Sequence, residues 1–366
     1  MTRMHGIIFA YGKCPKLQTL VEQRVADSIP YAARYRIVDF TISNMVNAGV
    51  TDVGIILQDK YQSMLDHLGS GKDWDLSRKH GGLRLLPSVP KIDPSREFRG
   101  KMEALAAIES YVQRIRQEYV VLANGALICN MPLGEVLEEH IRSGADITCV
   151  CAPGGDGKTT SYLMDEDGTI TDVVSRGEVR GGCDALEVYI ISKKLLLELI
   201  AECDGPNEYS FHRAVLQGMK NRLKLHAYVF RGYAARIMSV DNYYKRSMEL
   251  LRAEVRADLF LPERPIRTKD RSDASTYYGP GSTCVNSLVS DGCIIEGQVE
   301  DSIIFRGVRV EKGAKVCGCI VMQDTVIRAG ATLKYAIADK NVTITENRML
   351  MGHSNYPLAI SKFSIV

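Results

Sequence analysis

The sequence predicts an α/β protein in two parts, a doubly wound, Rossmann-like domain followed by a left-handed parallel β-helix. Two observations predict this fold. In the first 250 residues, short apolar runs alternate with segments of helical periodicity, which is typical of a sheet covered by helices. Beyond a polar stretch at 261–275, six-residue units repeat, and these units indicate the coils of a β-helix.

The N-terminal part begins with an apolar run at 7–10 that we interpret as the first strand. Further strands are predicted at 51–57, 120–123, 146–151, 185–191 and 225–230. Helices are predicted at 40–48, 102–115, 133–142 and 193–201. The run Asp-Glu-Asp-Gly at 165–168 is a turn signal, so we expect two strands on either side of it.

The C-terminal part contains two kinds of repeated segment. The segment 287–292 recurs at 302–307 and 319–324, the segment 310–316 recurs 17 residues later at 327–333, and a looser copy follows at 336–339. An antiparallel meander is disfavoured, because its hairpins would show Asn-Gly or Asp-Gly turns and period-2 alternation. We expect a first domain at 1–260, a linker at 261–283 and a β-helix at 284–366, with glycines at the tight corners of the coils.

Composition excludes several classes of protein. Hydrophobic residues make up 45% and charged residues 25% of the 366 residues, and the net charge is only +2. Neither nucleic acid nor a membrane is therefore an expected partner. The sequence shows no signal peptide and no run of about 18 apolar residues, so we expect a cytoplasmic protein.

The 10 cysteines and seven histidines show no metal-ligand spacing, and no Cys-x-x-Cys occurs. Cys149 and Cys151 are two positions apart, as are Cys317 and Cys319, and on a strand this spacing places each pair on one face. We interpret the cysteines as small thiols that fill the core in a reducing compartment.

The turn after the first predicted strand contains Gly12, Cys14, Pro15 and Lys16. A phosphate-binding loop needs several consecutive backbone N–H groups, and glycines let the backbone approach the anion. This turn keeps one glycine, Pro15 removes a donor and Cys14 adds a side chain. We therefore expect weak phosphate binding at this turn.

The segment that follows contains Tyr35 to Phe40, Ser43, Asn44, Asn47 and Gly49. With these residues it resembles the N-terminal region of bacterial glucose-1-phosphate adenylyltransferase (ADP-glucose pyrophosphorylase). In that family the first strand leads into Gly-Gly-x-Gly-x-Arg-Leu, which matches 11–17 here, with Lys16 at the arginine. The lysine keeps the charge but loses the bidentate fork. The resemblance spans nearly the whole chain and implies a nucleotidyltransferase domain at 1–260.

The resemblance also locates the family's two Mg²⁺-binding carboxylates, and neither is present. Ala126 stands at the aspartate of the family's Ser-Gly-Asp-His block, and Arg236 stands at the aspartate of its Trp-Arg-Asp-Val-Gly-Thr block. Mg²⁺ needs hard oxygen ligands, usually one or two carboxylates, and a cation repels it. We therefore expect no catalytic residue and no bound metal in this chain. The nearest other oxygen ligands in the sequence are Asn124, Asn130 and Asp241.

Two more binding segments of the family are altered. The phosphate-binding lysine of its Arg-Ala-Lys-Pro is replaced by Ala26, with Asp27 at the proline. Its Gly-Thr-Ala-Asp-Ala segment reads Gly-Lys-Met-Glu-Ala at 100–104, which keeps a helix start and an acid.

Five polar residues remain as candidates for binding a substrate or an anionic effector: Arg24, Arg34, Arg36, Gln58 and Arg176. Arg176 matches the family's sugar-phosphate-binding Glu-Lys-Pro, and either clamps a phosphate or is a solvated surface arginine. The other three arginines match a region whose basic residues serve the family's activator anion. The alternative is a charged helix start with salt-bridge partners. Gln58 matches a glutamine near the nucleotide and effector region.

A chain that keeps the scaffold and loses the metal ligands resembles the regulatory, D-type partner subunit of this family. The resemblance implies a catalytically deficient subunit that supports ADP-glucose synthesis for glycogen biosynthesis. Its expected partners are a catalytic glucose-1-phosphate adenylyltransferase subunit, in a heterotetramer, and an anionic sugar-phosphate effector. Self-association stays open. Mg²⁺ would belong to the catalytic partner, and no cofactor is expected on this chain.

Three alternatives stay open at this point. The first is an active sugar-phosphate nucleotidyltransferase that converts ATP and glucose 1-phosphate to ADP-glucose and pyrophosphate with altered metal ligands. The second is a β-helix acyltransferase, which is disfavoured because 284–346 contains no histidine. The third is a free-standing sensor of sugar phosphates or nucleotides that has no partner chain.

Overall fold

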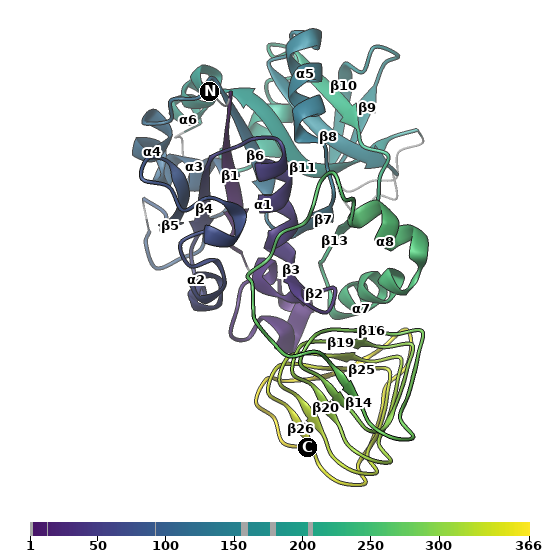
Figure 1. Ribbon diagram of the computed structural model, residues 1–366. Coiled ribbons are helices and arrows are strands. Elements are labelled where there is room, and N and C mark those ends of the chain that lie inside the picture. Colours follow the sequence, from purple (N-terminus) through teal and green to yellow (C-terminus); the bar gives the residue numbers. More distant parts are fainter. Residues whose placement is uncertain (1–2, 13, 92, 155–159, 176–180, 204–207) are drawn as a thin grey trace.

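The computed structural model describes residues 3–12, 14–91, 93–154, 160–175, 181–203 and 208–366. A domain of helices around a central sheet lies against one side of a triangular stack of coils (Figure 1). No helix in the described ranges combines the length and the apolar character needed to cross a membrane.

The central sheet of the first domain is mixed. Within the described residues it has nine strands, in the order β10-β9-β11-β6-β1-β4-β5, with β8 also beside β11 and β12 beside β8. The strands are β1 (Met4–Ala10), β4 (Asp52–Leu57), β5 (Gly82–Pro87), β6 (Tyr119–Asn124), β8 (Ile147–Pro153), β9 (Thr160–Met164), β10 (Ile170–Ser175), β11 (Cys183–Ser192) and β12 (Leu225–Val229). Strands β6, β1, β4 and β5 run parallel, whereas β11 is antiparallel to both β6 and β8. The carboxyl ends of the parallel strands therefore meet at one edge.

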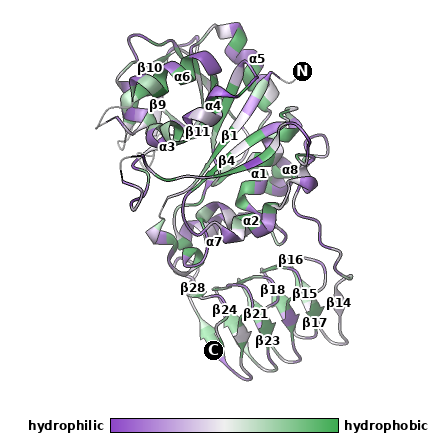
Figure 2. Cartoon of the chain, turned by 90° about the vertical axis from the view of Figure 1, so that its left-hand side faces the viewer, coloured by the Kyte–Doolittle hydropathy of each residue, from purple (hydrophilic) through white to green (hydrophobic). Residues whose placement is uncertain are grey.

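Helices cover both faces of this sheet, as the doubly wound prediction requires. The helices of the first domain are α1 (Ile37–Asn47), α2 (Gln62–Leu68), α3 (Lys101–Ala107), α4 (Glu109–Gln113), α5 (Leu133–Ser143), α6 (Lys193–Glu202), α7 (Val240–Met248) and α8 (Ala253–Leu259). Ile7 and Phe9 of β1 pack with α3, α4 and α6, whereas Ile8 and Ala10 pack with α1, α2 and α5. Alternate residues of a strand point to opposite faces, which explains why this strand is apolar throughout. Figure 2 shows the apolar central strands between helices of mixed hydropathy.

Short elements complete the domain. They are the 3₁₀ helices η1 (Pro15–Val21), η2 (Ala26–Ser28), η3 (Lys72–Trp74) and η5 (Glu249–Leu251), the π-helical turn η4 (Phe211–Gln217), and the paired strands β2 (Pro30–Tyr31) with β3 (Tyr35–Arg36) and β7 (Leu127–Cys129) with β13 (Ala234–Arg236).

We predicted one helix at 102–115, but the structure has two shorter helices there, α3 and α4. Ile108 takes φ −109° and ψ 18°, and its N–H bonds to the carbonyl of Leu105, which tightens the end of the first helix. The predicted turn at 165–168 is confirmed, since it joins the antiparallel strands β9 and β10.

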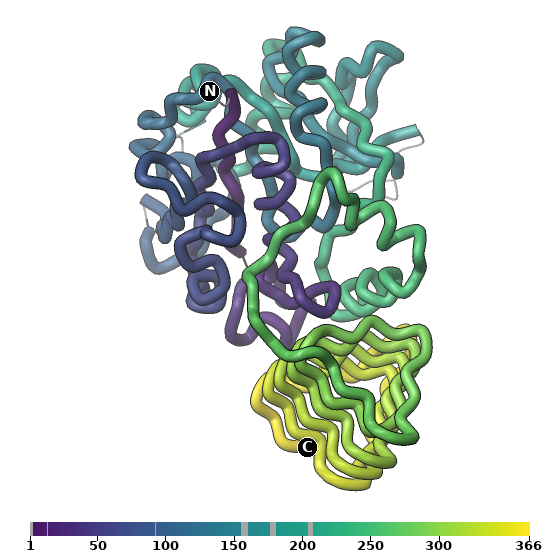
Figure 3. Tube along the Cα trace, in the orientation of Figure 1, coloured from purple at the N-terminus to yellow at the C-terminus, as the bar shows by residue number. Residues whose placement is uncertain are grey.

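Residues 277–360 form the coils of a β-helix. Its three parallel sheets have five strands each, in the orders β14-β17-β20-β23-β26, β15-β18-β21-β24-β27 and β16-β19-β22-β25-β28. The strands are β14 (Tyr277–Tyr278), β15 (Thr283–Val285), β16 (Leu288–Val289), β17 (Ile294–Ile295), β18 (Gln298–Glu300), β19 (Ile303–Ile304), β20 (Arg309–Val310), β21 (Lys315–Cys317), β22 (Ile320–Val321), β23 (Val326–Ile327), β24 (Thr332–Lys334), β25 (Ala336–Ala338), β26 (Thr343–Ile344), β27 (Met349–Met351) and β28 (Leu358–Ile360). The tube in Figure 3 shows these coils stacked below the first domain.

The corners of the coils differ from two of our predictions, which were glycine at each tight corner and one shared strand face for Cys317 and Cys319. Asp324 stands where the earlier copies have Gly292 and Gly307, and all three adopt positive φ, at 58°, 73° and 70°. Aspartate tolerates this region better than most residues, so the corners are not restricted to glycine. Cys317 and Cys319 do not share one strand, because Gly318 turns a corner between them with φ 61°.

An apolar core joins the two domains. Leu17, Leu20 and Phe40 of the first domain cluster with Tyr243 of α7 and with Ile303 of the coils. The same junction contains one buried ion pair, in which Arg24 Nη2 lies 2.8 Å from each carboxylate oxygen of Asp339. The side chains are 4% and 1% exposed. The pair thus ties the segment after η1 to the end of β25, across the domain boundary.

We predict that Asp339→Asn lowers the free energy of unfolding by about 3–5 kcal/mol, because it leaves the Arg24 charge buried without a counter-ion. Urea unfolding of the full chain measures this change. The matched control is Glu202→Gln, which breaks an equally short two-bond pair with Arg222 on the exposed surface and should change stability little. Equal losses in the two variants would contradict the prediction.

Candidate functional site

The candidate site lies at the carboxyl edge of the parallel strands, where β1 leads into Tyr11, β4 into Gln58 and β6 ends at Asn124. Strand β13 pairs with β7 so that Arg236 lies opposite Leu127. This pairing brings the two altered metal positions, Ala126 and Arg236, to the same edge.

Glu187 is the central group of this edge. Arg236 Nη2 lies 2.7 Å from Glu187 Oε1, and Lys101 Nζ forms an ion pair with Glu187 Oε2. The amide of Asn124 donates to the same Oε2 at 3.0 Å. The side chains of Lys101, Glu187 and Arg236 are 14%, 15% and 20% exposed. We call these three residues the charged triad.

The backbone aims Glu187 at the two cations. Strand β11 changes register between Ala185 and Val188 against β8, and Glu187 takes φ 58° at this bulge. A positive φ at a glutamate costs about 1 kcal/mol or more and is typically found at functional positions. Burial alone would raise the pKa of Glu187, but the charges of Lys101 and Arg236 hold that pKa well below its usual range. Glu187 is therefore an anion with both oxygens engaged.

The residues at this edge do not fit a magnesium ion. Ala126 offers no ligand atom, and the side-chain oxygen of Asn124 already accepts the Ala126 N–H at 2.8 Å. Asn130 is buried and donates to the carbonyls of Leu259, at the end of α8, and of Arg264. Asp241 is exposed in the first turn of α7. Among the described residues, no group of three or more His, Cys, Asp or Glu side chains is arranged to hold a metal.

Asp27 is a second buried acid near this edge. Its side chain packs against Gly125, where a Cβ would lie 2.3 Å from Oδ1. Oδ1 has no hydrogen-bond partner. Burial raises the pKa of Asp27 to about 7. The residue at the family's proline position is thus a poorly solvated carboxyl group, which a phosphate ligand would not approach favourably.

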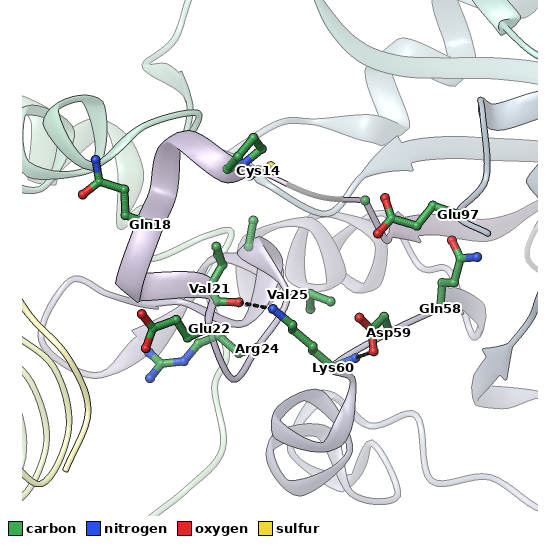
Figure 4. A pocket seen from close by; sticks show the side chains of 13 residues that line it. Cys14, Gln18, Val21, Glu22, Arg24, Val25, Gln58, Asp59, Lys60 and Glu97 are labelled. Atoms are coloured by element: carbon green, nitrogen blue, oxygen red, sulfur yellow. Dashed lines mark hydrogen bonds between the residues drawn. The ribbon is translucent and has the colours of Figure 1, made fainter. Parts of the chain in front are cut away.

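The structure brings Arg24 and Gln58 to one cavity of about 240 Å³, shown in Figure 4. Cys14 and Pro15 of the altered turn line the same cavity. The Gln58 side chain is occupied by backbone, since its Nε2 donates to the Arg96 carbonyl at 2.7 Å and its Oε1 accepts the Phe98 N–H at 3.0 Å. Gln58 thus holds the 96–98 loop in place.

The three N-terminal arginines do not act as one cluster. Arg34 is exposed, and its guanidinium lies 5.8 Å from the centre of the Tyr35 ring. Arg36 caps α1, where its N–H donates to Asp39 and its guanidinium donates to Ser63. This geometry matches the alternative of a charged helix start. Arg176 lies outside the described residues.

Arg24 and Arg36 do share a second group of charges with the coils. Lys340 and Lys362 lie near both arginines, and three acids, Asp339, Asp39 and Asp66, lie near these cations. Burial and the neighbouring arginines lower the pKa of Lys340 to about 7, and burial lowers that of Arg36 to about 10. We call Arg24, Arg36, Lys340 and Lys362 the junction cations.

Three residues that form the central ion pairs were not singled out from the sequence: Lys101, Glu187 and Asp339. Glu187 carried a signal, because it is a charged residue inside the apolar run at 185–191 that we predicted as a buried strand. Lys101 and Asp339 carried none, since each lies in a segment where a charged residue is ordinary.

We predict that Glu187→Gln lowers the free energy of unfolding by about 3–5 kcal/mol, because it leaves two cations buried together. Arg236→Gln should cost clearly less, since Lys101 and Glu187 remain a balanced pair. Denaturant unfolding of both variants measures the difference. A larger loss in Arg236→Gln than in Glu187→Gln would contradict the charge arrangement.

We predict a pH signature for Asp27. Below pH ~4 the carboxyl is protonated in both folded and unfolded chains; as the pH rises toward 7, only the unfolded chain releases the proton, so stability falls. The stability of the wild type relative to Asp27→Asn should therefore drop by roughly 2–4 kcal/mol between pH ~4 and pH ~7.5. Urea unfolding across this range measures the drop, and parallel curves for the two proteins would contradict it.

Comparison with known proteins identifies the family. A family model described as nucleotidyl transferase matches residues 5–175, and one described as GlmU-like, C-terminal hexapeptide matches residues 275–355.

Glycogen biosynthesis protein GlgD of Bacillus subtilis (strain 168) is 36% identical over 362 residues, which cover 98% of this chain and 96% of that protein. GlgD of Geobacillus stearothermophilus is 36% identical, over 86% of this chain and 83% of that protein. Glucose-1-phosphate adenylyltransferase of Bacillus cereus (strain Q1) is 28% identical over 96% of this chain and 95% of that enzyme. The chain therefore belongs to the bacterial glucose-1-phosphate adenylyltransferase family, and of the three relatives named here the two D-type proteins, GlgD, share the higher identity with it.

Proposed function

We propose that this chain is a catalytically deficient, regulatory subunit that acts in glycogen biosynthesis beside a catalytic glucose-1-phosphate adenylyltransferase. The observation that carries the proposal is the charged triad. Nucleotidyl transfer develops charge on the phosphates, and the family neutralises it with Mg²⁺ held by carboxylates. Here one carboxylate position is Ala126, and the other is Arg236, whose charge is balanced by Glu187.

The active-enzyme alternative would need other acids at this edge. The nearest are Glu187, whose oxygens accept bonds from Lys101, Arg236 and Asn124, and Asp27, which is buried against Gly125. Either acid could bind a metal only after its present environment was dismantled. The arrangement thus favours the regulatory proposal.

A regulatory subunit also needs a way to sense a metabolite. We propose that an anionic sugar phosphate binds at the junction cations. Four cations face three acids there, and two of the acids are already engaged: Asp339 by Arg24, and Asp39 by the Arg36 N–H and His67. Burial is the main cause of the lowered pKa of Lys340, and repulsion from Arg36 and Arg24 lowers that pKa further. A bound dianion would relieve this repulsion and would touch both domains at once.

The proposal predicts two results. The purified chain alone should form no ADP-glucose from ATP and glucose 1-phosphate with Mg²⁺. Co-expressed with a catalytic subunit, it should co-purify as a heterotetramer and change the partner's affinity for substrate or effector. A coupling of about 1–3 kcal/mol corresponds to a change of roughly 5–150-fold.

The measurement is a coupled assay of ADP-glucose formation, combined with size-exclusion chromatography. Arg222→Gln is a suitable control chain, because Arg222 is exposed on the surface, where its ion pair is with Glu202. Mg²⁺-dependent turnover by the chain alone would support the active-enzyme alternative instead. Unchanged kinetics of a partner that co-purifies would contradict the regulatory role, and the absence of co-purification would favour a free-standing sensor.

A further inference from the structure

A second polar cavity lies at the opposite edge of the sheet from the candidate site. It has a volume of about 380 Å³ and is lined by the amino ends of β1 and β4, by the loop before β5, and by the segment after α4. We call it the amino-edge recess. Because β1 is seven residues long, the recess and the candidate site are separated by roughly 20 Å along the strand. The recess is therefore a separate feature of the fold.

Four cations surround the recess: Lys79, Arg84, Arg114 and Arg116. All four are exposed at its rim, and in the part of the chain that the structure describes none of them has an acidic partner within ion-pair distance. The chain as a whole carries a net charge of only +2, so this concentration of positive charge is local. Charge of one sign in a concave site attracts a ligand of the opposite sign.

The floor of the recess is polar and contains one unsatisfied group. His5 is only 5% exposed, and its Nε2 lies 2.9 Å from the Tyr111 hydroxyl, whereas its Nδ1 has no hydrogen-bond partner. Burial lowers the pKa of His5 to about 4, so the ring is neutral at pH 7 and carries one proton. Nδ1 is shielded from solvent and Gln117 lies beside the ring, so the imidazole forms part of the wall and a ligand in the recess meets the cations instead.

The single acid of the recess is already satisfied by neighbouring donors. Asp52 Oδ2 accepts from the Gln117 amide at 2.7 Å and from the Thr51 hydroxyl at 3.0 Å. Gly81 closes over the same carboxylate with φ 80°, and a Cβ there would lie 1.7 Å from Asp52 Oδ1. The acid is thus held against the wall, and the four cations outnumber it.

We propose that the amino-edge recess binds a small phosphate-bearing anion, held by Arg84 and Arg114. Guanidinium groups bind phosphate oxygens in pairs, and an excess of cations suits a dianion. The volume is within the range of small-molecule sites. The polar floor favours an ionic ligand over an apolar one. The anion can be free phosphate or the phosphate group of a sugar ester, because the contacts described are to phosphate oxygens.

Calorimetric titration of the full chain without magnesium tests the proposal, with inorganic phosphate and glucose 6-phosphate as probes. The double variant Arg84→Gln/Arg114→Gln should bind at least one probe ~10-fold to 100-fold more weakly than the wild type, since each lost charged hydrogen bond is worth about tenfold or more. The matched control is Arg222→Gln/Arg328→Gln, which removes two exposed arginines elsewhere and should bind as the wild type does.

The relative affinity of the two probes identifies the source of the anion. Tighter binding of glucose 6-phosphate indicates a sugar ester, and equal or tighter binding of inorganic phosphate indicates free phosphate. The proposal is overturned if neither probe binds the wild type, or if the double variant binds both probes as tightly as the wild type does. It is also overturned if Arg36→Gln alone abolishes binding, because the anion would then lie at the junction cations. No partner chain is needed, so this result is independent of the proposed regulatory function.

Discussion

The carboxylate of Glu187 determines whether the carboxyl edge of the central sheet can bind a metal ion. It lies between Lys101 and Arg236 and accepts a further bond from Asn124. A bulge in β11 and a positive φ at Glu187 are needed to place it there. Local strain of this kind persists only when the surrounding contacts over-determine the geometry. The triad supplies those contacts, because Lys101, Arg236 and Asn124 together occupy both oxygens of the Glu187 carboxylate.

An ion pair within the protein also occupies a charged side chain at the domain junction. Arg24 stands in the segment where the family has phosphate-binding cations, and here it is held by Asp339 of the coils. Arg24 also lines the cavity that contains Cys14 of the altered turn. The β-helix is therefore connected by an ion pair to the wall of the cavity shown in Figure 4. Under the regulatory proposal, a ligand that changes the charge balance at the junction would act on Arg24, which belongs to both the ion pair and the cavity.

Much of the fold could be predicted from the sequence, because repetition and alternation are local signals. The 17-residue offset between 310–316 and 327–333 predicts the spacing between coils, and β20 indeed pairs with β23 at this offset. The two altered metal positions could be located by resemblance, and the structure places Ala126 and Arg236 at one edge. The partner of Arg236 could not be predicted in this way. Glu187 reaches it only through a bulge, and a bulge depends on how two strands pair rather than on either sequence alone. Asp339 and Arg24 are more than 300 positions apart, so no periodicity relates them.

The proposal of a catalytically deficient subunit requires that no divalent cation binds at the edge between Ala126 and Arg236. Anomalous diffraction from crystals soaked with Mn²⁺ and ATP measures this most directly, because Mn²⁺ uses the same oxygen ligands as Mg²⁺ and its position can be seen without assumptions about the protein. We expect no anomalous peak at this edge and an unbroken contact between Arg236 and Glu187. An ordered ion bound there, with Glu187 turned away from Arg236 and Lys101 to coordinate it, would contradict the proposal of a catalytically deficient subunit.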